Sequence, residues 1–186
     1  MRRRVTPFLS AALAVMAVLA STVPLRAGQS PEATARERAA KPAVPGKLDI
    51  IKKLTGEWVE VGPDGKPTTK VISSYHVTAG GSAVEETIFA GQDHEMITLY
   101  HMDGDELVLT HYCVMGNQVR MKAEPQTDPR KLVFHCAGGT NMKSESEEHM
   151  HHATIVWKDD NHIHSEWQEV KDGRNVMTAA FDLARK

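Results

Sequence analysis

Turn-forming residues recur at short intervals through the later part of the chain, and this spacing constrains the fold more than any other feature. Glycine, proline, asparagine and aspartate interrupt the sequence so often that helices of ordinary length do not fit between them. The breaks lie at Pro63-Asp64-Gly65, Gly80-Gly81, Gly91, Asp103-Gly104, Gly116-Asn117, Pro125 to Pro129, Gly138-Gly139, Asp159-Asp160 and Asp172-Gly173. Such spacing is typical of short strands joined by turns, and it predicts an all-β domain.

Ten strand-like segments are separated by these breaks. They cover residues 56–61, 68–77, 82–89, 94–102, 106–114, 118–123, 131–136, 149–157, 162–169 and 175–185. A meander of neighbouring strands has two exposed edges, and closing it into a barrel removes them. We therefore predict an antiparallel up-and-down barrel of about ten strands. Leu48, Ile51 and Leu54 recur every three residues, which predicts a short N-terminal helix at the closed end of the barrel.

Alternation along the strands indicates which side chains face the lumen, because successive residues of a strand point to opposite faces. Three strands show a clear inner face. The predicted inner residues are Leu107, Leu109, His111 and Cys113; His149, His151, Ala153, Ile155 and Trp157; and Met177, Ala179, Phe181, Leu183 and Arg185. In strand 94–102 both faces mix apolar and polar residues, so its orientation stays open.

The N-terminus has the pattern of an export signal. A basic start, MRRR, precedes an apolar stretch at 8–20 and then small residues. We expect a signal peptide over residues 1–27, with cleavage after Ala20 or after Ala27. The apolar stretch is too short to span a bilayer comfortably. The mature protein is thus expected to be exported, periplasmic or extracellular, and to have no membrane span.

Composition separates a linker from the barrel and narrows the class of partner. Residues 28–46 are rich in Ala, Pro, Glu, Arg and Lys with no apolar period, which predicts a flexible linker before a barrel domain at 47–186. A net charge of −2 lacks the basic character of nucleic-acid-binding proteins. The expected partner is therefore a small molecule or a metal ion, not a nucleic acid. The sequence carries no signal for the oligomeric state.

A short motif resembles a known superfamily. Gly56-Glu57-Trp58 follows the predicted helix, and Arg185 lies on the last predicted strand. This arrangement resembles the calycin signature of lipocalins and their relatives. The strand count is more similar to fatty-acid-binding and nitrobindin-like barrels, and the chain also resembles exported bacterial lipocalin-like proteins. The resemblance covers residues 48–186 and implies that Trp58 sits at the closed end with Arg185 packed across it.

Up-and-down topology gathers alternate turns at one end of the barrel. The turns expected at the open end are those around Pro63, Gly91, Gly116, 138–148 and Asp172. His94, His111, Arg120, His149 and His151 lie near these turns and are predicted to bind a ligand at the mouth.

Two predicted ligand-binding residues have open alternatives. Arg120 faces the lumen and anchors an anionic group, or it faces outward if the turn at Gly116 shifts the alternation by one residue. Glu86 alternates with Val84 and Ile88, and it either faces a polar lumen or is an exposed carboxylate beside Glu85.

Surplus histidine provides the candidate metal site. Seven of the ten histidines lie between His94 and His152, and imidazole binds metals near neutral pH. His149 and His151 offer two ligands from one strand, with His111 as the third and water in an open position. The expected metal is zinc or another divalent ion in preference to haem. The alternative is a solvated strand end below an acidic loop.

The two cysteines are expected to be free thiols. Strand 118–123 lies between the strands of Cys113 and Cys136. Two strand spacings place their backbones about 10 Å apart, whereas a disulfide requires Cα atoms within about 7 Å.

Three classes of function remain open from the sequence. The first is a binding protein that holds a small ligand or metal at a histidine-rich barrel mouth. The second is a metal-dependent enzyme that uses the same histidines, although the sequence has no nucleophile–base signature and no catalytic residue is assigned. The third is a structural barrel filled by its own side chains.

Overall fold

The computed structural model describes residues 46–186. The predicted signal peptide lies outside these residues, as does the predicted linker apart from Gly46. The elements are α2 (Leu48–Lys52), β1 (Gly56–Val61), β2 (Pro67–Thr78), the 3-10 turn η1 (Ala79–Gly81), β3 (Ala83–Ile88), β4 (Met96–Asp103), β5 (Glu106–Tyr112), β6 (Gln118–Ala123), β7 (Lys131–Thr140), β8 (His149–Asp159), β9 (His162–Lys171) and β10 (Arg174–Arg185).

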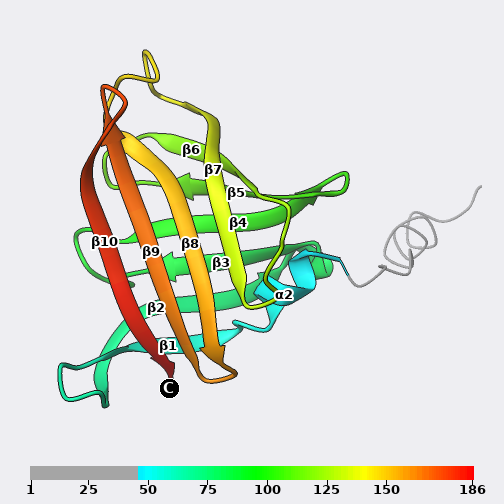
Figure 1. Cartoon of the computed structure of the whole chain (residues 1–186), viewed down its shortest axis with the longest axis vertical. Helices are drawn as coiled ribbons and strands as arrows, with labels where there is room; N and C mark the ends of the chain where they lie inside the picture. Colours follow the sequence, from blue (N-terminus) through cyan, green and yellow to red (C-terminus); the bar gives the residue numbers. More distant parts are fainter. Residues whose placement is uncertain (1–45) are drawn as a thin grey trace, which may run out of the picture. The chain divides into compact units, whose positions relative to one another are not determined.

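The ten strands form one closed antiparallel barrel in which each strand pairs with its neighbours in the chain and β10 closes onto β1. The predicted fold class is confirmed. Figure 1 shows that β1 to β6 run across the view, whereas β7 to β10 run steeply over them. The two groups of strands thus pack face to face, and the apolar side chains between them form the core.

The core follows the predicted alternation on β5 and at one position of β10. Leu107, Leu109 and His111 on β5 are buried, as is Leu183 on β10. Helix α2 adds Leu48 and Ile51 to the same core. The helix ends at Lys52, two residues before the predicted end. The buried Leu54 lies in the turn that follows, and its backbone N–H donates a hydrogen bond to the Ile51 carbonyl. In the described part of the chain, no helix is long and apolar enough to span a membrane.

Trp58 and Arg185 meet, as the calycin resemblance implied. They are register partners on β1 and β10, and the Arg185 guanidinium carbon lies 4.5 Å from the centre of the indole ring. The indole N–H donates to the Leu54 carbonyl at 2.7 Å. The guanidinium donates to the carbonyls of Thr55 (2.7 Å) and Lys53 (2.8 Å), so it ties the helix turn to the last strand.

The predicted inner face of β8 is wrong at its first residues. A β-bulge between Met150 and His152 shifts the register with β9. Met150 therefore lines the interior together with Ala153, although the two are an odd number of positions, three, apart in the sequence. A bulge inserts one residue and reverses the alternation beyond it. This is why His149 and His151 do not continue the inner row of Ala153 and Ile155.

Strand β7 continues through Gly138-Gly139, which the sequence pattern had indicated as a break. Gly138 has φ 105°, a conformation that favours glycine. A β-carbon on Gly139 would lie 2.7 Å from the Gln118 carbonyl oxygen. Here the glycines allow β6 and β7 to approach closely, so they extend a strand instead of ending it.

Candidate functional site

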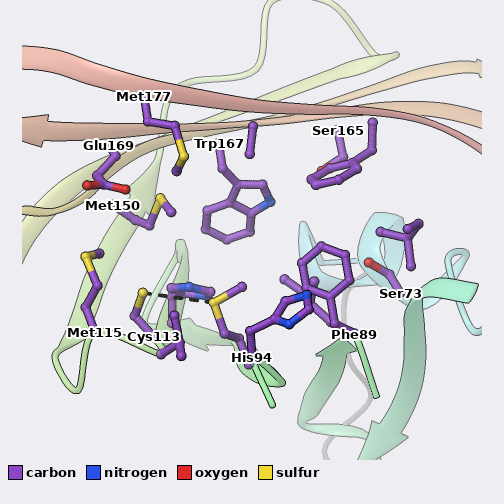
Figure 2. A pocket seen from close by; sticks show the side chains of 17 residues that line it. Ser73, Phe89, His94, Cys113, Met115, Met150, Ser165, Trp167, Glu169 and Met177 are labelled. Atoms are coloured by element: carbon purple, nitrogen blue, oxygen red, sulfur yellow. Dashed lines mark hydrogen bonds between the residues drawn. The ribbon is translucent and has the colours of Figure 1, made fainter. Parts of the chain in front are cut away.

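The barrel contains a cavity of about 320 Å³. It lies near the ends of β3, β5 and β9, where the sequence predicted an open mouth, and most of its lining is apolar. Figure 2 shows Trp167 projecting into the cavity, with Met150 and Glu169 to its left and Phe89 to its right. A volume at the small end of the range for ligand pockets suits a compact molecule.

His111 brings a polar atom into this apolar cavity. Its side chain is 1% exposed, and its ring packs on Trp167 with 4.7 Å between ring centres. Nδ1 lies 3.0 Å from the Thr98 hydroxyl oxygen. Nε2 is buried and has no hydrogen-bond partner among residues 46–186. An unpaired buried polar atom is uncommon and costly, so it marks a position where a bound group would be stabilised.

Burial keeps the His111 imidazole neutral. Removal from solvent lowers the pKa of His111 to about 4. At neutral pH the ring therefore offers one N–H and one lone pair, and Thr98 takes one of them. Nε2 presents the other to the cavity, as a donor or as an acceptor according to the tautomer.

The rim of the cavity carries a carboxyl group with a perturbed pKa. A hydrogen bond with the Glu148 carboxyl, together with burial, raises the pKa of Glu169 to about 7. Glu148 also accepts a hydrogen bond from Lys171 at 3.1 Å. Glu169 therefore changes its charge near neutral pH at the edge of the apolar pocket.

His94 lies at the same entrance. It precedes β4, which begins at Met96 and not at His94 as predicted. The exposed His94 ring packs on Phe89 with 4.6 Å between ring centres, and both residues line the cavity. The position fits its predicted place at the mouth.

Glu86 faces the interior and does not line the cavity itself, although its hydrogen-bond partner Ser73 does. It is 1% exposed and accepts hydrogen bonds from Ser73 at 2.9 Å, Tyr75 at 2.7 Å and Tyr100 at 2.7 Å. Burial raises the pKa of Glu86. Because three hydroxyl groups already satisfy the carboxylate, the geometry favours a structural role over ligand binding.

Arg120 follows its outward alternative. It pairs with Asp103 at 2.5 Å on the surface of the barrel, and its neighbours on β6, Val119 and Met121, are the buried residues. Its guanidinium therefore points away from the cavity.

Cys113 lines the cavity as a free thiol, and Cys136 is free as well, as predicted. The Cys113 sulfur lies 4.0 Å from the Met96 sulfur. Burial raises the pKa of the Cys113 thiol, which disfavours the reactive thiolate.

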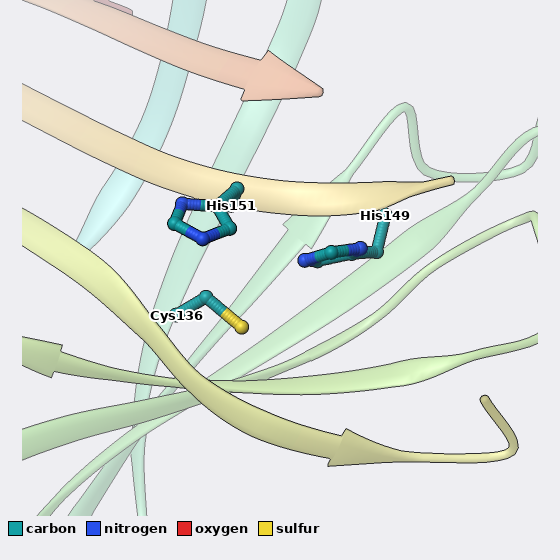
Figure 3. A group of neighbouring side chains, drawn as sticks. All are labelled: Cys136, His149 and His151. Carbon is teal, nitrogen blue, oxygen red and sulfur yellow. The ribbon is translucent and has the colours of Figure 1, made fainter. Parts of the chain in front are cut away.

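The histidines predicted to bind metal separate into two places. Among the described residues, the group whose ligand atoms lie within 4.8 Å of one another is Cys136, His149 and His151. His111 is not part of it, because the bulge in β8 turns the two histidines away from the row that His111 faces. Figure 3 shows both imidazoles reaching from β8 toward the Cys136 sulfur on β7.

Sequence reasoning considered Cys136 only as a disulfide partner and missed its place beside the histidines. The usable signal was the hairpin: Cys136 precedes the long loop, and His149 and His151 follow it. Cys136 directly follows the last residue of β7 that pairs with β8, His135, and His151 directly precedes its partner His152 on β8, so the three side chains lie just beyond the paired part of the hairpin.

Burial and neighbouring charges shift the pKa values of two members of this cluster, His151 and Cys136. Burial lowers the pKa of His151, and the nearby His149 and His135 lower it further. Burial raises the pKa of Cys136, an effect that the N–H of Gly138 opposes and the charge of Glu145 increases.

The fold and the cavity define a ten-stranded antiparallel β-barrel with an apolar interior pocket. No protein-family model and no curated protein matches the chain.

Proposed function

We propose that this protein is an exported binding barrel that holds a small, largely apolar molecule in its cavity. The proposal places one polar group of that molecule against His111 Nε2. The single observation that carries it is the unpaired, buried Nε2 inside an otherwise apolar pocket. The presence of the pocket supports a binding barrel over a barrel filled by its own side chains.

The energetics favour a ligand with one hydrogen-bonding group. A buried polar atom without a partner costs about 1–3 kcal/mol, and a ligand that supplies the partner recovers part of this. A hydroxyl group suits the site because it both donates and accepts, so it matches either tautomer of His111. The apolar remainder of the ligand gains from burial against Trp167, Phe89 and Phe181.

Export and membership of the calycin superfamily belong to the same proposal. The basic and apolar N-terminal pattern supports export. The stacking of Arg185 on Trp58 supports the calycin resemblance.

The test compares two aromatic probes that differ by one hydroxyl group, 1-naphthol and naphthalene. Calorimetry measures their affinities for the purified chain. A net hydrogen bond of about 1 kcal/mol predicts that 1-naphthol binds about fivefold more tightly. Substitution His111→Phe keeps an aromatic ring but removes Nε2, so it should abolish this preference while naphthalene still binds.

His76 lies on the barrel surface, and His76→Ala is the matched control, which should leave both affinities unchanged. Failure of the wild-type chain to bind either probe would contradict an accessible apolar pocket. An undiminished preference for 1-naphthol in His111→Phe would contradict the role of Nε2.

A further inference from the structure

The barrel wall has a seam between β7 and β8 at one end. Their pairing extends from Lys131 opposite Val156 to His135 opposite His152. Beyond this point, within the described part of the chain, β7 pairs with β6 alone, through Cys136, Gly139 and Thr140. The start of β8 pairs with β9 instead. The two strands therefore diverge, and side chains occupy the space where a backbone ladder would otherwise run.

Cys136, His149 and His151 face one another across this seam (Figure 3), with ligand atoms within 4.8 Å. His149 is 1% exposed and the other two are partly exposed. A buried imidazole beside a thiol and a second imidazole is the donor set of tetrahedral zinc and related transition-metal sites.

The hydrogen bonds of the histidines leave the appropriate nitrogen atoms free. His149 Nδ1 lies 2.6 Å from the Glu147 carbonyl oxygen. A carbonyl only accepts, so Nδ1 carries the proton and Nε2 keeps its lone pair. His151 Nδ1 lies 3.0 Å from His152 Nδ1; in the tautomer in which His151 Nδ1–H donates this bond, Nε2 of His151 keeps its lone pair for a metal. Metal-binding histidines are commonly oriented by such a hydrogen bond from their other ring nitrogen.

One contact of the Cys136 sulfur opposes the effect of burial, which raises the pKa of this thiol. The backbone N–H of Gly138 lies 3.5 Å from Sγ. An N–H that points at sulfur stabilises the thiolate, which is the form that binds metal.

We propose that Cys136, His149 and His151 bind one zinc-like divalent transition-metal ion that joins β7 to β8 across the seam. The site is separate from the cavity and does not include His111. Three protein ligands leave a tetrahedral ion one position for water or another small ligand.

The required adjustment is small. Zinc–sulfur and zinc–nitrogen bonds of about 2.3 and 2.0 Å place tetrahedral donor atoms about 3.3–3.6 Å apart. Donor atoms that already lie within 4.8 Å therefore need to close by at most about 1.5 Å. Side-chain rotations of Cys136 and of the partly exposed His151 supply this without a change in the strands.

The experiment uses the full chain under reducing conditions and titrates it with Co²⁺, whose spectrum reports both a sulfur ligand and tetrahedral geometry. We expect one Co²⁺ per chain, a thiolate-to-cobalt charge-transfer band, and displacement of the cobalt by Zn²⁺. Zn²⁺ at 100 times its Kd should also raise the Tm by about 5 °C or more, because it binds the folded chain alone.

Matched variants locate the site. Cys136→Ser should eliminate the charge-transfer band, and His151→Gln should weaken Co²⁺ binding at least tenfold. Cys113→Ser changes the other thiol and His111→Phe changes the cavity histidine, so both should keep the wild-type spectrum. Circular dichroism without metal verifies that each variant is folded.

A second readout does not depend on the folding of Cys136→Ser. In Cys113→Ser, Cys136 is the only remaining thiol, and Zn²⁺ should protect it from a thiol-specific reagent. The proposal is overturned if Zn²⁺ gives no protection, if the charge-transfer band persists in Cys136→Ser, or if Cys113→Ser loses it.

Discussion

Replacing Trp58 with alanine should remove the strongest single anchor at the helix end of the barrel. The indole is fully buried. Truncation of a buried Trp to Ala typically costs about 3–5 kcal/mol. The change also deprives the Leu54 carbonyl of its donor and Arg185 of its stacking partner. Cation–π stacking at a partly exposed site is worth about 0.5–1 kcal/mol.

These contributions overlap, so we expect a loss of about 4–5 kcal/mol in the free energy of unfolding for Trp58→Ala. At a urea m-value of about 2 kcal/mol/M, the unfolding midpoint should fall by about 2 M. Circular dichroism is the appropriate probe, since removal of a tryptophan alters the fluorescence. Tyr112 is a substantially exposed aromatic residue, and Tyr112→Ala is the control, with an expected loss below about 1 kcal/mol.

Two milder variants separate the contribution of the indole N–H from that of the Arg185 guanidinium. Trp58→Phe keeps an aromatic ring for Arg185 but removes the N–H, so it should cost about 1–3 kcal/mol. Arg185→Lys keeps the charge, but an ammonium group lacks the planar guanidinium that donates to the carbonyls of Thr55 and Lys53 together. This variant should lower the free energy of unfolding by about 1 kcal/mol. A loss below 1 kcal/mol for Trp58→Ala would refute the reasoning, because it would show that the indole does not anchor the barrel.

Three further outcomes follow from the structure. Glu169 has a raised pKa of about 7 when folded, so its stabilising contribution is lost as pH rises through about 7. Thermal melts should therefore show Glu169→Gln near wild type at pH 5 and more stable than wild type at pH 8. Gly139→Ala should lower the free energy of unfolding by about 1–3 kcal/mol in urea melts, because its β-carbon would collide with the Gln118 carbonyl. Thiol titration of the denatured, unreduced chain should find Cys113 and Cys136 both free, and a bridge between them would contradict the strand order.

Periodicity was sufficient to predict the barrel because the turn residues and the two-residue alternation act locally. β1 and β6 begin and end at the predicted residues, and the inner row of β5 is the predicted one. The same local rule placed His111 inside. It did not indicate that Nε2 would lack a partner, because that depends on Thr98 and Trp167 from other strands.

Alternation failed at β8 because a bulge has no reliable signature in one sequence. One extra residue between Met150 and His152 moves His149 and His151 from the expected lumen to the β7 seam. Glu86 shows a different limit. The sequence placed it correctly as an inward candidate, but the hydroxyl groups of Tyr75 and Tyr100 that satisfy it come from two different strands.

The contrast between Glu86 and His111 indicates how the barrel divides its interior. Glu86 is a costly buried carboxylate, yet three hydroxyl groups neutralise that cost, and their network makes the surrounding wall rigid. A neutral imidazole such as His111 loses less free energy on burial than a carboxylate does. Its Nε2, however, has no hydrogen-bond partner in the described part of the chain. A protein that needed only a filled core would gain from an apolar residue at position 111. Retaining an imidazole there is reasonable if a molecule that enters the cavity completes its hydrogen bonding.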